Sequence, residues 1–332
     1  MPNVLLTQRC VRSCPYCFAR KQMEDSIPDD MLTWENLIYI TDLLETSGRS
    51  NISLLGGEPT LHPNFVDFVL YLINRNFNVN VFTSGIMSQK KLDDLKNAVQ
   101  DIDPGRLSFL CNVNEPLKSP PDEVEKVKTF LENFSVYTSL GFNIYELDFN
   151  MKFLVHYINQ YGLRKTIRLG LAHPIPGMQN QCIDINKFPE VVTRLFEFMP
   201  LFERFNLQIG FDCGFHLCKF TNEQLGILNK PLPAGVKFGC GPAVDIGPDM
   251  TVWSCFPLSS YQKKSIYDFD SFDDIVKFYE DFHSKVRIEV AGVYNECDGC
   301  RYRENHICDG GCLAHSLNNF KDEYAIRIKD VY

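Results

Sequence analysis

Apolar runs and segments of helical period alternate through the first two thirds of the chain. Seven short runs rich in β-branched and other apolar residues predict strands, at 4–8, 51–57, 77–85, 106–114, 144–149, 166–172 and 207–211. Between them, apolar residues recur at helical spacing, as in the stripes that begin at Phe65, after the cap candidate Asn64, and at Phe188. This alternation implies a parallel sheet with helices outside it.

About six units of strand and helix are too few for a closed barrel of eight. We therefore predict an α/β fold over residues 1–212, a partial (β/α)6 TIM-like barrel. In such barrels the loops after the carboxyl ends of the strands carry the chemistry. The loop after the first predicted strand contains CVRSCPYC, residues 10–17, whose cysteines have a C-x3-C-x2-C spacing.

The composition changes after about residue 212, where Gly, Pro and Cys become dense. The runs 244–246 and 251–255 predict a β-hairpin that turns at Gly247-Pro248-Asp249, with Trp253 in the core. A helical stretch at 271–285 and a Cys-rich tail follow. We predict a second, smaller domain over 213–332, whose thin core needs cofactor cross-links.

Composition and charge exclude several classes of protein. The 332 residues are 45% apolar, which is enough for a large core, and the net charge is −9 with no cluster of Lys and Arg. We therefore expect no nucleic-acid partner. There is no apolar run of 18 residues and no basic segment ahead of an apolar one, so we expect neither a membrane protein nor a secreted one, and place the chain in the cytoplasm.

Thirteen cysteines without an export signal argue for metal or cluster ligation, because disulfide frameworks belong to small secreted domains. Three lie in the first loop, at Cys10, Cys14 and Cys17. Eight follow residue 210: Cys213, Cys218, Cys240, Cys255, Cys297, Cys300, Cys308 and Cys312. Eight thiolates would complete two four-iron clusters if all of them ligate. Zinc is the alternative for both sets.

Three short motifs stand at the carboxyl ends of successive predicted strands. They are C-x3-C-x2-C with Tyr16 before its last cysteine, Gly56-Gly57-Glu58-Pro59, and Thr83-Ser84-Gly85. Together they resemble the signature of the radical S-adenosylmethionine (radical SAM) superfamily, in which many members have Thr-Asn-Gly at the third motif.

The resemblance implies the cofactors and their contacts. Cys10, Cys14 and Cys17 would hold a [4Fe-4S] cluster, and S-adenosylmethionine would chelate the fourth iron through its amine and carboxylate. An electron from a partner such as flavodoxin or ferredoxin would then cleave the cofactor to a 5'-deoxyadenosyl radical. The implied cofactor contacts are the backbone of Gly56, Gly57 and Glu58 in the motif that ends at Pro59, Tyr16 along the adenine, Thr83 and Ser84 as lining residues, and Arg168 at the carboxylate.

The tail resembles the SPASM domain, which carries auxiliary clusters in many radical SAM enzymes that modify peptides. The resemblance implies one cluster on Cys240, Cys255 and Cys312 and another on Cys297, Cys300 and Cys308. Cys213 and Cys218 are candidates for the two remaining positions, and their assignment, like a single-cluster domain, stays open. Three features depart from the family: Met250 follows Asp249 where glycine is usual, the spacing from Cys300 to Cys308 is wide, and no cysteine follows Cys312.

Three residues are candidates for a direct catalytic role. Cys111 and Cys182 could donate a hydrogen atom to a substrate radical, although a lone strand cysteine such as Cys111 is usually a small buried hydrophobe. Asp212, at the end of the seventh predicted strand, could deprotonate or orient a substrate, or simply cap local structure. His173 could line the same pocket.

Three functions fit the sequence. The first is hydrogen abstraction from a ribosomally made peptide, leading to a cross-link, a thioether or an epimer; anaerobic sulfatase maturation is a special case that the cysteine spacing disfavours. Since the first strand begins near residue 4, we expect the barrel mouth or a separate partner to hold the peptide. The second is dehydrogenation or rearrangement of a small molecule. The third is a non-catalytic zinc or iron-sulfur scaffold.

Overall fold

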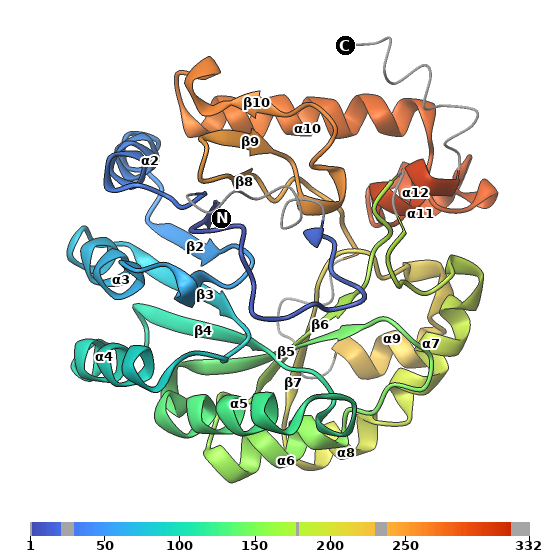
Figure 1. Cartoon of the computed structure of the whole chain (residues 1–332). Coiled ribbons are helices and arrows are strands. Elements are labelled where there is room, and N and C mark those ends of the chain that lie inside the picture. Colours follow the sequence, from blue (N-terminus) through green and yellow to red (C-terminus); the bar gives the residue numbers. More distant parts are fainter. Residues whose placement is uncertain (1, 21–29, 177–178, 230–237, 320–332) are drawn as a thin grey trace.

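A sheet of ten strands organises the chain, in the order β10-β9-β8-β1-β2-β3-β4-β5-β6-β7. The computed structural model describes residues 2–20, 30–176, 179–229 and 238–319 (Figure 1). The strands are β1 Asn3–Leu5, β2 Asn51–Leu55, β3 Asn78–Thr83, β4 Leu107–Asn112, β5 Thr138–Ile144, β6 Thr166–Leu171, β7 Gln208–Phe211, β8 Asp245–Ile246, β9 Thr251–Trp253 and β10 Lys264–Ser265. Strands β1 to β7 pair in parallel, which confirms the predicted partial barrel.

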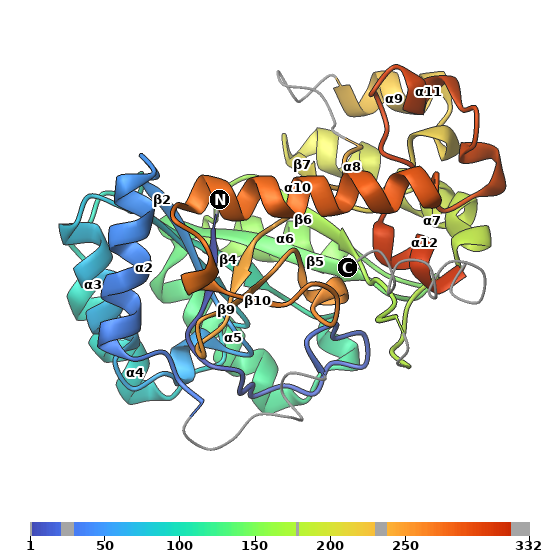
Figure 2. The same cartoon turned by 90° about the horizontal axis from the view of Figure 1, so that it is seen from above.

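Helices cover the outer face of the parallel strands, and a long helix runs beside the last three strands (Figures 1 and 2). The helices are α2 Trp34–Thr46, α3 Phe65–Asn74, α4 Gln89–Val99, α5 Pro121–Asn133, α6 Lys152–Tyr161, α7 Phe188–Phe196, α8 Met199–Arg204, α9 Asn222–Asn229, α10 Phe272–Glu289, α11 Arg301–Glu304 and α12 Leu313–Asn319. No helix in these described parts of the chain is both long and apolar enough to cross a membrane.

The two faces of the parallel strands differ in polarity. On β4 the buried Phe109 faces the helices, where its ring meets Phe130 of α5 edge to face at 5.4 Å between centroids. Residues of the opposite face pair with one another across strands, as Ser108 Oγ does when it donates to Asn80 Oδ1 at 2.9 Å. Because successive side chains of a strand point to opposite faces, the helix side of β4 is apolar, while Ser108 lies on the face that lines the barrel interior.

One predicted strand is wrong by about one strand length. The apolar pattern predicts strand five at 144–149, but β5 runs over Thr138–Ile144 and only Ile144 is shared. The true strand alternates regularly, but it contains Gly141 and Asn143, which have low β-propensity, whereas the segment after it offers Tyr145, Leu147 and Phe149. Residue propensity, rather than periodicity, therefore favoured the wrong segment.

The predicted hairpin is confirmed as the antiparallel pair β8 and β9. Its turn places Met250 at a φ of 63°, the left-handed conformation that favours glycine, while Met250 N donates to Gly247 O at 3.0 Å. Strand β8 also pairs in parallel with β1, so the hairpin extends the barrel sheet. The predicted helix at 271–285 is confirmed as α10, and Trp253 is fully buried. The domain boundary at 212 stays a prediction, and residues 230–237 and 320–332 of the second domain lie outside the described residues.

Candidate functional site

The loop after β1 carries Cys10, Cys14 and Cys17, all half-buried. Cys17 N donates to Cys14 O at 3.1 Å, and Arg12 N approaches Cys10 Sγ at 3.4 Å, so the loop folds back on itself. Burial raises the pKa of Cys10 to about 12 and that of Cys17 to about 11. Thiols bind a metal as thiolates, so binding releases their protons to solvent and ligation is pH-dependent.

Two glycines let the loop after β2 approach the cysteine loop. Gly57 N donates to Thr7 O at 2.9 Å, and Glu58 N donates to Arg9 O at 2.7 Å. A Cβ on Gly56 would lie 2.2 Å from Thr7 O, and one on Gly57 would lie 2.1 Å from Arg9 O. These contacts hold the backbone of the turn directly against the loop that carries the three cysteines.

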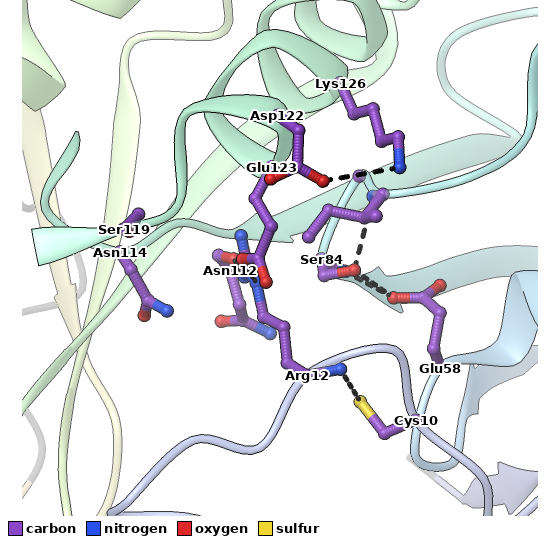
Figure 3. A network of polar contacts seen from close by, with 12 residues as sticks. Cys10, Arg12, Glu58, Ser84, Asn112, Asn114, Ser119, Asp122, Glu123 and Lys126 are labelled. Carbon is purple, nitrogen blue, oxygen red and sulfur yellow. Dashed lines mark hydrogen bonds and ion pairs between the residues drawn. The ribbon is translucent and has the colours of Figure 1, made fainter.

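The Glu58 side chain ties the loops after β2 and β3 together (Figure 3). It is 1% exposed. One carboxylate oxygen accepts from the hydroxyls of Thr60 at 2.9 Å and Thr83 at 2.7 Å. The other accepts from Ser84 N at 2.7 Å and Ser84 Oγ at 2.5 Å. Glu58, Thr83 and Ser84, three predicted cofactor contacts, therefore form one hydrogen-bonded unit, the Glu58 unit. It fixes the loops after β2 and β3 relative to each other.

Arg12 fixes the cysteine loop to β4 and α5 (Figure 3). Its Nε donates to Glu123 Oε2 at 3.1 Å, and one terminal nitrogen donates to Asn112 O at 2.8 Å. The Arg12 side chain is only 7% exposed and that of Glu123 21%. This contact joins the loop after β1 to the end of β4 and the first turn of α5.

Tyr16 faces the ends of β4 and β5. Its hydroxyl donates to Asn114 Oδ1 at 2.7 Å, and its ring stacks on Tyr145 at 4.7 Å between centroids. The loop after β6 also meets this segment, since Gln181 N donates to Pro15 O at 2.9 Å. This hydrogen bond places the loop that carries Cys182 beside the cysteine loop. Cys182 itself is half-buried.

Polar side chains of the barrel interior converge on β6 and β7. Arg168 donates to Asp212 Oδ2 at 2.7 Å and lies 5.0 Å from the centroid of the Phe82 ring. Asn143 fills the space beside Gly170, where a Cβ would lie 2.4 Å from its Oδ1. Asp212 is thus an ion-paired residue in the interior, and both partners are more than a third exposed.

Cys111 points the other way. It is fully buried, and a Cβ on Gly85 would lie 3.1 Å from its Sγ, next to the Phe130 ring. This is the helix side of β4, opposite Ser108 and Asn112. The position favours the interpretation of Cys111 as a small buried hydrophobe.

The cysteines of the second half fall into two groups. The first group is Cys213, Cys240, Cys255 and Cys312. The Cys312 thiol forms hydrogen bonds with the thiols of Cys213 and Cys240. Cys255 interacts electrostatically with Cys312 and Cys213. Interaction with Cys312 and burial raise the pKa of Cys213 well above its ordinary value. His173 Nε2 lies 3.6 Å from Cys213 Sγ, so the predicted pocket residue His173 borders this group.

The second group is Cys218, Cys297, Cys300 and Cys308, which line one pocket. Its other lining residues include His216 and Tyr294. Burial raises the pKa of Cys218, with contributions from Cys297 and Cys308. Cys213 and Cys218, five positions apart in the sequence, are therefore divided between the two groups.

The donor chemistry of these cysteine sets, rather than convergence on one point, is the observation that bears on what they could hold. A single metal ion needs its donors to converge on one point, and within the described parts of the chain no three His, Cys, Asp or Glu side chains do so. A [4Fe-4S] cluster takes one thiolate at each of four irons, so its ligands stand apart around it. Thiols are the donors that such a cluster takes, and each set supplies them.

Residues 4–135 match the family model described as the radical SAM superfamily. This stretch includes the loop of Cys10, Cys14 and Cys17, the glycine turn at Gly56 and Gly57, and the Glu58 unit. The chain carries a radical SAM domain.

Relatives of the domain differ in what their names say they act on. The chain is 32% identical over 130 residues to an S-adenosylmethionine-dependent nucleotide dehydratase of Selenomonas ruminantium, covering 35% of this chain and 46% of the relative. It is 34% identical over 109 residues to a PqqA peptide cyclase of Gluconobacter oxydans, covering 31% of this chain and 28% of the relative. The chain thus spans less than half the length of these curated relatives.

Solved structures extend the likeness of the fold beyond the radical SAM domain. SuiB of Streptococcus suis bound to S-adenosylmethionine is 14% identical with a TM-score of 0.67, covering 97% of this chain and 74% of that chain. The protein anSMEcpe with bound AdoMet is 15% identical with a TM-score of 0.65, covering 100% of this chain and 95% of that chain. At these identities the likeness shows the fold alone.

The radical SAM motifs did not reveal every residue of the site. Sequence reasoning missed Arg12, Glu123, Asn114, Tyr145 and His216. Arg12 lies inside the cysteine motif, so its position was a signal, but its partner Glu123 is 111 residues away. Asn114 and Tyr145 follow strands whose ends meet only in the folded sheet.

Proposed function

We propose that this chain is a radical SAM enzyme that abstracts a hydrogen atom from a residue of a ribosomally made peptide. Cys10, Cys14 and Cys17 would hold the [4Fe-4S] cluster that chelates S-adenosylmethionine. When bound, that pair supplies a 5'-deoxyadenosyl radical as the abstracting agent. The backbone of Gly56 to Glu58 would receive the cofactor amine, and Tyr16 would lie along the adenine.

The first cysteine group carries the proposal. Cys213 follows Asp212 directly, and Cys213 N donates to Asp212 Oδ1 at 3.0 Å. Asp212 in turn pairs with Arg168 in the barrel interior. An auxiliary cluster on Cys213, Cys240, Cys255 and Cys312 would therefore adjoin the interior, where it can accept the electron that a substrate radical loses.

The second cysteine group would hold a further auxiliary cluster on Cys297, Cys300 and Cys308, with Cys218 and His216 beside the fourth position. Two auxiliary clusters are typical of SPASM domains in enzymes that modify peptides. Solved structures of the same fold include SuiB bound to its precursor peptide SuiA and anSMEcpe bound to the Cp18Cys peptide. An external donor such as flavodoxin or ferredoxin would reduce the first cluster, and the reducing cytoplasm suits iron-sulfur clusters.

A small-molecule substrate is the second candidate. The Arg168 guanidinium, 37% exposed in the interior, suits an anionic ligand, and a nucleotide dehydratase is among the relatives. Asp212 neutralises part of this charge, which favours a peptide substrate. Peptides encoded beside the gene and common nucleotides, tested in parallel for product formation, distinguish the two.

The test is oxygen-free reconstitution of the full chain, followed by iron analysis and an assay for 5'-deoxyadenosine. We expect about twelve irons per chain and cofactor cleavage. The Cys10→Ala, Cys14→Ala, Cys17→Ala triple variant should keep about eight irons and make no 5'-deoxyadenosine. Cys182→Ala, which removes a half-buried thiol nearby, is the control and should keep all the iron. Cleavage by the triple variant, or zinc in place of the tail iron, would contradict the proposal.

A further inference from the structure

The pocket of the second cysteine group has five candidate donors for four irons. Cys297, Cys300 and Cys308 come from one short segment, while Cys218 and His216 both come from the loop after β7. Cys218 is solvent-exposed, and His216 is 2% exposed. The fourth ligand must therefore be chosen between an exposed thiol and a buried imidazole.

Hydrogen bonding fixes the tautomer of His216. Its Nδ1 lies 2.9 Å from Tyr294 Oη, and Tyr294 Oη donates its one proton to Ile185 O at 3.0 Å. With that proton used, the contact requires Nδ1–H of His216 to be the donor. The Nε2 atom of the neutral ring then carries a bare lone pair.

That lone pair has no partner among the described residues. Nε2 is buried and makes no hydrogen bond there, although the ring borders the cysteine pocket. A buried polar atom without a partner is costly, and such atoms usually have a ligand or a hydrogen bond.

The local backbone leaves space beside this buried nitrogen. Gly311 adopts a φ of 85°, and a Cβ there would lie 3.0 Å from Nε2 of His216. The Phe188 ring packs 4.4 Å from the imidazole centroid and holds its plane. Histidines that bind metals usually donate their other ring N–H to a neighbouring group, as His216 does to Tyr294.

We propose that His216 Nε2 is the fourth ligand of the cluster on Cys297, Cys300 and Cys308, and that Cys218 is a free thiol at its exposed edge. This assignment rests on the proposed function, because it needs an iron-sulfur cluster in the tail. A neutral nitrogen in place of a thiolate leaves the cluster less negative, so its reduction potential is higher than that of an all-cysteine cluster.

The test uses the triple alanine variant at Cys10, Cys14 and Cys17, which leaves only the tail clusters. The chain is labelled with ¹⁵N-histidine, reconstituted without oxygen and reduced, and pulsed EPR then measures nitrogen couplings. We expect a directly coordinated ¹⁵N signal that persists in Cys218→Ser and in His306→Gln, an exposed histidine between Cys300 and Cys308. The signal should vanish in His216→Gln. In His216→Cys the iron should remain, and the potential of one cluster should fall.

Each other outcome overturns the assignment in a recognisable way. Tail iron without any histidine coupling in the labelled parent leaves the auxiliary clusters in place and makes Cys218 the ligand. Loss of about four irons in Cys218→Ser leads to the same conclusion. A parent without tail iron overturns the assignment together with the auxiliary clusters of the proposed function. The parent spectrum requires no substitution at His216, so it tests the ligand even where a His216 variant folds poorly.

Discussion

Arg12 and Glu123 form a largely buried ion pair that links the cysteine loop to the first turn of α5, with Nε and Oε2 3.1 Å apart. The guanidinium also donates to Asn112 O. Both the acidic partner and the carbonyl are needed, because a buried cation without them has lost its hydration without replacement.

Glu123→Ala should lower the free energy of unfolding by about 2 kcal/mol, less than a fully buried pair because Glu123 is partly exposed. Chemical denaturation of the apo chain measures this. Glu125→Ala on the same helix breaks only an exposed pair with Lys128 and should leave the free energy of unfolding almost unchanged. Equal losses in the two variants would show that the Arg12 pair adds nothing to stability.

Glu58→Gln should lower the free energy of unfolding by about 2 kcal/mol. The amide NH2 would replace a carboxylate oxygen that now accepts from hydroxyl and N–H groups, so donors would face donors. Glu132→Gln, at an exposed position of α5, should change stability by about 0.5 kcal/mol at most. Denaturation curves of the two variants provide the comparison. If Glu58→Gln matched its control, the hydrogen-bonded unit would be of no energetic consequence.

Gly57→Ala should separate the glycine turn from the cysteine loop, because its Cβ would overlap Arg9 O. We expect reconstituted chain to lose the iron of the first cluster and keep that of the tail. Gly226→Ala in α9 is the matched control: its Cβ meets nothing within 4 Å, and it should stabilise the helix by about 0.5 to 1 kcal/mol. Full iron content in Gly57→Ala would refute the close approach of the two loops.

Asp245 should make stability fall with rising pH. Burial raises its pKa from 3.8 to about 7, and Asn3 Nδ2 donates to it at 2.7 Å. Between those values the folded state holds a proton that the unfolded state has lost, so this group's contribution declines through that window and stays low above it. Asp245→Asn should remove this decline.

Denaturation midpoints of the wild type and Asp245→Asn at about pH 5 and about pH 8 test this expectation, with the difference between the two proteins isolating Asp245 from other titrating groups. A difference that does not change with pH would show that Asp245 titrates at its ordinary value in the folded chain.

Local patterns were enough to predict the radical SAM motifs and most of the barrel. Cys10, Cys14 and Cys17 lie within one loop, and Gly56 to Pro59 within another. Each motif is therefore a short continuous stretch that can be recognised from the sequence. The strands followed from apolar runs because most of them are buried on one face at least. Strand five was placed wrongly because Gly141 and Asn143, which face the barrel interior, have low β-propensity.

By itself the sequence predicted which residues would carry cluster chemistry, and it determined that parallel strands follow one another along the barrel. Only the tertiary structure decided which of these residues meet. Cys213 and Cys218 are neighbours in the chain but belong to different groups, and Arg12 meets Glu123 across 111 positions. The physical reason is that spacing along a chain constrains contacts within a loop, whereas contacts between loops depend on how the whole sheet curves and packs.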